Sequence, residues 1–358
     1  MSFMKYDMEN SENKSRKMTR KGFLRVLGSI GAGGVIAGGS GNLLYKMFSK
    51  PEELFYQTNE KTGTTPQRSA FSSPYRKVAS FKVPEVVESF ELYQSNIVVA
   101  SSHKVFVYDA DGNLKKSFGV DGEVMDVTVN EDLIYVLYPM HVDVFNMNGD
   151  KLHGWDACDD KADYCSLTVF DGNVFITDAQ NKLMCKYLTD GTFVKFIESP
   201  HGFVVPSYSF GITNMNGLVY CSNPGRHTVE SYSTEGEFIA SFGEAGVSEG
   251  RFSGCCNPVY VTANPAGEII TSEKGIPRIS CYGTNGEFRS VLLDEKTLGG
   301  GHSAYEVRVK NDKLIVANRN QVTTYQYDKS LVAQNGTALS GKCVTCGIPC
   351  PLKTGVTI

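Results

Sequence analysis

A register of aromatic residues and glycines recurs along this chain of 358 residues, and it constrains the fold more than any other feature. In each copy a glycine follows an aromatic residue by four positions, and a large apolar residue follows the glycine by six. The aromatic and glycine pairs are Tyr108 with Gly112, Phe145 with Gly149, Tyr187 with Gly191, Tyr232 with Gly236 and Tyr282 with Gly286. The apolar residues are Phe118, Trp155, Ile197, Phe242 and Leu292. A sixth copy is degenerate, with Tyr327 and then Leu331 in the glycine position.

The distances between successive turn glycines are 37, 42, 45 and 50 residues, which is the period of a four-stranded propeller blade. Each unit contains short runs of branched and aromatic residues, such as residues 127 to 129 and 134 to 137, as expected of strands. Dipeptides such as Asp111-Gly112 and Asn148-Gly149 tolerate positive φ and form tight hairpins. We therefore predict an all-β fold, a six-bladed β-propeller, over residues 76 to 330.

A ring of blades leaves an unpaired sheet edge unless residues from the opposite end of the chain complete the last blade. Residues 79 to 81 read Ala-Ser-Phe, the same order as residues 240 to 242 in an expected outer strand, and the last unit ends near Ser330. We predict that residues 76 to 82 form the outer strand of the sixth blade.

Two stretches carry a family resemblance. Residues 222 to 227 read Ser-Asn-Pro-Gly-Arg-His and residues 272 to 279 read Ser-Glu-Lys-Gly-Ile-Pro-Arg-Ile. With the strand and the Tyr-plus-glycine turn that follow, they resemble the NHL repeats of six-bladed, NHL/TolB-like propellers over roughly residues 76 to 330. Gly-Cys-Cys-Asn-Pro at residues 254 to 258 resembles a subset of bacterial NHL-type proteins that carry an export signal. The resemblance implies a fold rather than a function.

The amino-terminal segment predicts export. Residues 19 to 25 precede a glycine-rich, weakly apolar run at residues 26 to 41 and resemble a twin-arginine signal, with Lys21 where the second arginine would stand. An ordinary Sec signal or a signal anchor is the alternative. We expect a signal or membrane anchor over residues 1 to 49 and a polar linker over residues 50 to 75. The propeller would then be periplasmic, or anchored through its uncleaved amino-terminal segment to the inner membrane and facing the periplasm.

Composition narrows the function classes. The net charge of -4 comes from mixed signs with no basic stripe, which argues against nucleic-acid binding. No Ser-His-Asp arrangement, phosphate loop or HExxH motif is present in the sequence. The leading hypothesis is a monomeric, non-catalytic binding or scaffold module that recruits a protein or a small-molecule ligand at the propeller rim.

The carboxy-terminal tail, residues 331 to 358, predicts a metal centre. Cys343, Cys346 and Cys350 have CxxCxxxCP spacing, which resembles the last three cysteines of a bacterial ferredoxin cluster run. A 4Fe-4S cluster with a remote fourth ligand, or zinc with His302 as the fourth donor, would serve a redox partner. Disulfides and unpaired thiols are the alternatives.

Seven further cysteines precede the tail. Cys185, Cys221 and Cys281 fall in predicted strands, where a free cysteine usually acts as a small buried apolar residue. The others are expected at one mouth of the channel as a thiol redox or metal site: Cys158, Cys165, Cys255 and Cys256, with His302. A vicinal disulfide, or two disulfides that tie blade three to blade five, are equally favoured there.

Acidic and amide residues near strand ends give a second hypothesis. Asp163, Asp178, Glu273 and Asn318 are expected to face the channel, where lactonase and amidating-lyase propellers hold calcium or zinc. Arg278 with Glu273 is predicted either to bind a ligand carboxylate or to form a salt bridge within its own loop. A propeller enzyme with a channel metal, and a thiol redox protein that uses Cys255 and Cys256, are therefore the alternatives to a binding module.

Overall fold

The structure is a computed structural model that describes residues 73 to 334, all of which belong to one compact unit, Ser69–Ile358. The predicted signal or anchor, most of the polar linker and the cysteines of the tail, Cys343, Cys346 and Cys350, lie outside the described residues. Within residues 73 to 334, no helix has the length and apolar character needed to cross a membrane.

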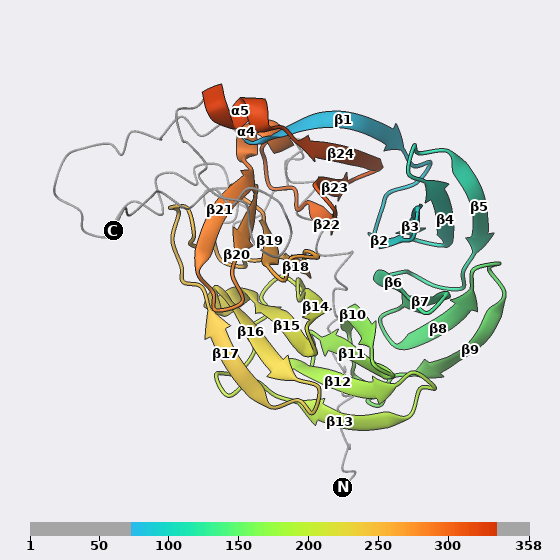
Figure 1. Ribbon diagram of the computed structural model, residues 1–358. Helices are drawn as coiled ribbons and strands as arrows, with labels where there is room; N and C mark the ends of the chain where they lie inside the picture. The colour runs from blue at the N-terminus through green and yellow to red at the C-terminus, as the bar shows by residue number, and fades with distance from the viewer. Residues whose placement is uncertain (1–72, 335–358) are drawn as a thin grey trace, which may run out of the picture. The chain divides into compact units, whose positions relative to one another are not determined.

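The described chain folds into six antiparallel sheets of four strands each (Figure 1). Blade one contains β2 (Ser89–Tyr93), β3 (Asn96–Ser101), β4 (Lys104–Asp109) and β5 (Leu114–Gly119). Blade two contains β6 (Asp126–Asn130), β7 (Leu133–Leu137), β8 (His141–Asn146) and β9 (Lys151–Asp156). Blade three contains β10 (Tyr164–Phe170), β11 (Asn173–Asp178), β12 (Leu183–Leu188) and β13 (Phe193–Ile197).

Blade four contains β14 (Ile212–Met215), β15 (Leu218–Asn223), β16 (Thr228–Ser233) and β17 (Phe238–Phe242). Blade five contains β18 (Tyr260–Ala263), β19 (Ile269–Glu273), β20 (Arg278–Tyr282) and β21 (Phe288–Leu293). Blade six contains β22 (Glu306–Lys310), β23 (Lys313–Asn318), β24 (Gln321–Tyr327) and β1 (Tyr75–Lys82). Within residues 73 to 334, the short helices η1 (Pro224–Arg226) and α4 (Glu295–Leu298) lie in connections between strands, and α5 (Lys329–Gln334) follows the last strand.

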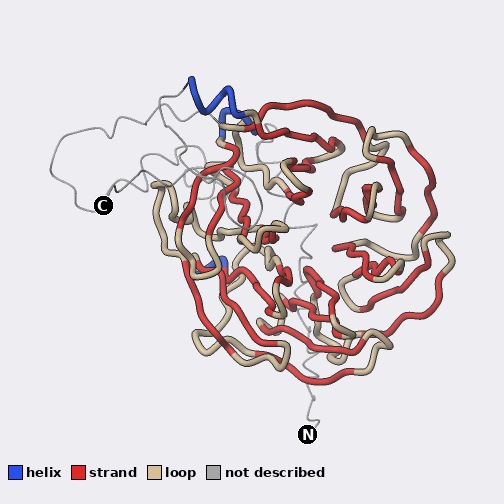
Figure 2. The backbone as a smooth tube through the Cα atoms, in the orientation of Figure 1, coloured by secondary structure: helices blue, strands red, loops and turns tan. Residues whose placement is uncertain are grey.

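The first strand of each blade lies innermost, and these strands contact one another in the cyclic order β2, β6, β10, β14, β18, β22 and β2 again (Figures 1 and 2). Buried apolar side chains form six clusters in the described chain, one between each pair of neighbouring sheets. The predicted six-bladed propeller is therefore confirmed, because both the inner strands and the core clusters run once around the ring.

The strand expected over residues 76 to 82 is β1, and it closes the ring. It pairs antiparallel with β24, so that Phe81 lies opposite Val322. Backbone bonds extend the junction at both ends, from Val83 N to Asn320 O at 2.8 Å and from Asp328 N to Pro74 O at 2.8 Å. β24 therefore has a partner on each side and presents no open edge to a second molecule.

The aromatic and glycine register marks a contact between consecutive blades. Each turn glycine lies against the large apolar side chain on the outer strand of the preceding blade. The contacting pairs are Gly112 with Phe81, Gly149 with Phe118, Gly191 with Trp155, Gly236 with Ile197 and Gly286 with Phe242. A Cβ at these glycines would approach that side chain to between 2.1 and 2.9 Å, and their φ values lie between +79° and +89°. Space and backbone conformation therefore both require glycine here.

The contact can be tested with a pair of substitutions that share the backbone cost. Gly286→Ala places a Cβ 2.1 Å from the Phe242 Cβ, whereas Gly217, with φ of +75°, has no atom within 4 Å of that position. Gly286→Ala and Gly217→Ala both place an alanine in the left-handed backbone region, which costs about 1–2 kcal/mol. Gly286→Ala should lose about 1–3 kcal/mol more through overpacking, measured as the free energy of unfolding in urea. Equal losses in the two variants would show that the interblade contact is not tight.

Candidate functional site

One face of the propeller collects the connections that carry the candidate residues. Because every sheet is antiparallel and every blade begins at its inner strand, the connections entering the blades and the turns between second and third strands meet at the same face. We call this the entry face. Its parts used below are residues 157 to 163, 198 to 211, 243 to 259, 274 to 277 and 294 to 305.

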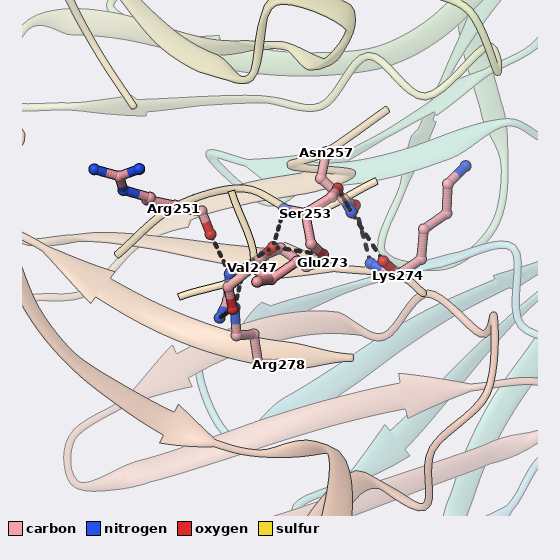
Figure 3. Close-up of polar contacts among 7 residues, drawn as sticks. All are labelled: Val247, Arg251, Ser253, Asn257, Glu273, Lys274 and Arg278. Atoms are coloured by element: carbon pink, nitrogen blue, oxygen red, sulfur yellow. Dashed lines mark hydrogen bonds and ion pairs between the residues drawn. The ribbon is translucent and has the colours of Figure 1, made fainter. Parts of the chain in front are cut away.

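Cys255 and Cys256 lie in the connection that enters blade five, with their Sγ atoms 3.3 Å apart. Cys255 is exposed and Cys256 is buried, with 6% of its surface accessible. Asn257, the next residue, fixes the backbone beside them (Figure 3). Its Nδ2 donates to Ser253 O at 2.6 Å and to Lys274 O at 2.8 Å, and its Oδ1 accepts from Lys274 N at 2.9 Å. The pair is therefore held on a connection that is bonded to the turn after β19.

The charge around the pair favours one thiolate. The hydrogen bond from Cys255 lowers the pKa of Cys256 to about 5, with Lys274 and Ser207 adding to this effect and burial opposing it. The same hydrogen bond raises the pKa of Cys255. Lys274 Nζ donates to Ser207 Oγ at 2.9 Å, which brings the connection into blade four to the same place. The two sulfurs thus share one proton beside a cationic side chain.

The Glu273 and Arg278 pair lies beneath this connection. Its side chains are 0% and 6% exposed, and Arg278 Nε donates to Glu273 Oε1 while Nη2 lies 3.1 Å from Oε2. Glu273 Oε2 also accepts from Ser253 N at 2.9 Å, and Arg278 donates to the carbonyl oxygens of Val247, at 3.1 Å, and Arg251 (Figure 3). These contacts join two strand ends to the connection that carries the cysteines.

A buried ion pair with these partners predicts a large effect on stability. Arg278→Met should lower the free energy of unfolding by about 3–5 kcal/mol, because it leaves the Glu273 carboxylate buried without its cation. Arg251→Met is the matched control, since that side chain pairs with Glu244 at the surface with 49% and 63% exposure. Its loss should stay below about 1 kcal/mol in the same urea titration. If Arg278 instead serves only to bind a ligand carboxylate, the two variants will unfold alike.

Glu273 stands at a repeated position, the last residue of the second strand, where Asp178 and Asn318 also stand. Each of them bonds to the connection entering its own blade. Asp178 Oδ1 accepts from Asp163 N at 3.1 Å, and Asn318 Nδ2 donates to Ala304 O at 2.9 Å. The four residues expected to face a channel metal are therefore spread around the ring and do not form one cation site. Over residues 73 to 334, no group of three His, Cys, Asp or Glu side chains is arranged to hold a metal ion.

The five residues expected at the channel mouth are divided among different places. His302 lies against the turn after β19, because its Nδ1 is 3.9 Å from a Cβ built on Gly275. Cys165 is buried between blades three and four, with its Sγ 3.6 Å from Asp163 O. Cys158 contacts Tyr164 and Tyr187, which pack between blades two and three. None of the seven cysteines among the described residues forms a disulfide.

A buried polar network on the inner strands of blades one, two and six was not expected from the sequence. Ser89 Oγ lies 2.5 Å from Asp126 Oδ1 and 3.0 Å from Glu306 Oε1. Arg308 lies 2.9 Å from Glu306 Oε1 and 3.0 Å from Glu91 Oε2. The Ser89 hydroxyl has one hydrogen and can donate it to only one of the two carboxyl groups at a time. A usable signal existed, because Ser89, Asp126 and Glu306 each begin an inner strand.

Glu306 predicts a pH dependence of stability. Burial raises its pKa to about 7, with Asp126 and Glu91 reinforcing and Arg308 and Ser89 opposing the shift. The pKa of Glu306 in the unfolded chain is 4.5. The protonated Glu306 therefore contributes its full stabilisation below pH 4.5, and this contribution is lost as the pH rises through about 7. Glu306→Gln should remove this decline in the free energy of unfolding, which amounts to as much as about 3 kcal/mol. Urea unfolding of both proteins from pH 4 to pH 8 measures it, and parallel curves would contradict the assignment.

Comparison with known proteins identifies the fold. No protein-family model matches the chain, and no curated protein matches it. Among solved structures, virginiamycin B lyase from Staphylococcus aureus is similar with a TM-score of 0.52 and 10% identity, over 70% of this chain and 99% of that one. A streptogramin B lyase is similar with a TM-score of 0.51 and 13% identity, over 71% of this chain and 97% of that one.

At these identities the likeness concerns the fold alone. The class defined by fold and topology is the six-bladed β-propeller. The NHL resemblance, the twin-arginine signal and the metal centre of the tail stay predictions.

Proposed function

We propose that this propeller is an exported binding module whose reactive group is the Cys255 and Cys256 pair, which accepts two electrons from a thiol partner at the entry face. The observation that supports it is the 3.3 Å approach of the two sulfurs beside Lys274, on a connection held by Asn257. Export is the prediction from the amino-terminal segment, and an exported protein meets the oxidising conditions in which the pair would form a disulfide.

The exposure of the two sulfurs gives the direction of the reaction. In the oxidised form, a partner thiolate attacks the exposed Cys255 Sγ, the bond between Cys255 and Cys256 breaks, and Cys256 leaves as a thiolate. A second partner thiol then attacks the sulfur bonded to Cys255, its proton passes to Cys255, and the partner leaves as a disulfide. The partner loses two electrons and the protein pair gains them. The low pKa of Cys256 makes it a good leaving group.

The same charges and hydrogen bond predict that the disulfide form of the Cys255 and Cys256 pair oxidises other thiols. A thiolate stabilised by Lys274 and by the Cys255 hydrogen bond stabilises the reduced form, and stabilisation of the reduced form raises the reduction potential. We therefore expect the pair to be reduced more easily than thioredoxin, whose potential is about -270 mV. A protein or small molecule that carries two thiols would be the partner class.

The proposal predicts how the Cys256 thiolate titrates. In reduced protein, the rate of iodoacetamide alkylation at Cys256 and the ultraviolet absorbance of the thiolate should both rise with a midpoint near pH 5. Lys274→Met should move the midpoint upward by about one pKa unit and lower the reduction potential in glutathione buffers. The control is Lys77→Met, because Lys77 is an exposed residue on the outer strand β1.

Mass spectrometry after alkylation in the same glutathione buffers decides the redox assignment. A reversible loss of two hydrogens confined to the peptide with Cys255 and Cys256 supports it. A pair that stays reduced in oxidised glutathione, or two separate glutathione adducts, would leave the module as a scaffold without thiol chemistry.

Two other predictions are separable from this one. The tail cysteines Cys343, Cys346 and Cys350 would hold an iron–sulfur cluster with a remote fourth ligand, or zinc with His302 as the fourth donor, which metal analysis of full-length protein and of a chain that ends at residue 334 tests. A lyase or lactonase activity with a channel metal is favoured only by the fold, and it requires calcium or zinc retained by that shortened chain.

A further inference from the structure

A second pair of thiols lies on the face of blade three that packs against blade two. Cys158 precedes the strand β10 and is exposed, whereas Cys185 lies within β12 and is fully buried. Cys158 N donates to Tyr187 Oη at 3.0 Å, and Cys158 Sγ lies 4.0 Å from Tyr164 Oη. The two phenol oxygens are 2.5 Å apart. Cys185 belongs to the same buried cluster as Tyr164 and Tyr187, so the two thiols meet at one pair of tyrosines.

We propose that Cys158 and Cys185 are a disulfide-forming pair, separate from Cys255 and Cys256. The sequence pattern groups Cys158 with Cys165, seven positions away. The structure separates these two, because Tyr164 and Cys165 are neighbours in β10 and their side chains point to opposite faces of the sheet. Cys185 is 27 positions from Cys158 in the sequence, yet it lies on the same face of blade three as Cys158.

The oxidation has a defined order with a disulfide such as oxidised glutathione. The exposed Cys158 attacks one glutathione sulfur and releases one reduced glutathione, which leaves a mixed disulfide on Cys158. Cys185 then attacks Cys158 Sγ, loses its proton to solvent and releases the second reduced glutathione. Two protein thiols are oxidised and one glutathione disulfide is reduced. Burial raises the pKa of Cys185, so the second step should be slow and should accelerate as the pH rises.

A disulfide between Cys158 and Cys185 would link the connection of residues 157 to 163 covalently to β12 in blade three. This connection is part of the entry face, and it is held by the bond from Ala157 N to Met140 O at 2.7 Å and from Tyr164 N to Pro139 O at 3.0 Å. Cross-linking two points of the chain restricts the unfolded ensemble. We therefore expect oxidation to raise the melting temperature, and reduction to reverse the change.

The test uses the full chain with Cys255→Ser and Cys256→Ser, so that the pair at blade five cannot exchange with other thiols. The protein is incubated with oxidised glutathione at pH 8, alkylated after unfolding and digested for mass spectrometry. We expect one peptide that links Cys158 to Cys185. Cys158→Ser should abolish the link and Cys165→Ser, the matched control, should keep it.

The outcomes are distinct. A stable glutathione adduct on Cys158 with Cys185 unmodified, or a link from Cys158 to any other cysteine, would overturn the pairing. A melting temperature that rises on oxidation in the parent and in Cys165→Ser, but not in Cys158→Ser, supports it by a second measurement. Because Cys158 is exposed, its serine variant should fold, and that variant decides the result whatever Cys185→Ser does to the core.

Discussion

The structure depends on one repeated contact, in which the turn glycine of each of blades one to five lies under a large apolar side chain from the blade before it. This contact between consecutive blades is close, because a Cβ at the glycine would overlap that side chain. The first blade receives its side chain, Phe81, from the strand that also completes blade six. One segment therefore supplies both the missing strand of the last sheet and the missing contact of the first.

In this ring, the strands of the blades hold the connections of the entry face in place. The last residue of the second strand repeatedly bonds to the connection entering its own blade, as Asp178, Glu273 and Asn318 do. In blade five that residue is an acid with a buried arginine partner, and the connection that it supports carries the cysteine pair. The candidate site is thus an elaboration of a structural position present in other blades, and its chemistry comes from Cys255, Cys256 and Lys274.

The features of the fold that could be predicted from the sequence follow from its repeated pattern of aromatic residues and glycines. The turn glycines, the closing strand and the burial of Cys185, Cys221 and Cys281 all follow from local pattern and strand chemistry. The grouping of Cys158 and Cys165 with Cys255 and Cys256 rested on loop position, and loop position does not say which face of a sheet a side chain enters. The Ser89, Asp126 and Glu306 network needs blades six and two on either side of blade one, and that adjacency exists only in the closed ring.

By itself, the sequence determined the number of blades, the position of the tight turns and the presence of a closing strand, since each follows from spacing along the chain and from residues that tolerate particular backbone conformations. Only the tertiary structure decided which thiols meet, which carboxyl groups meet at the Ser89 hydroxyl and which cation lies beside Cys256. These are properties of residues distant in the sequence, and pKa values depend on burial and on neighbouring charges that the folded ring alone brings together.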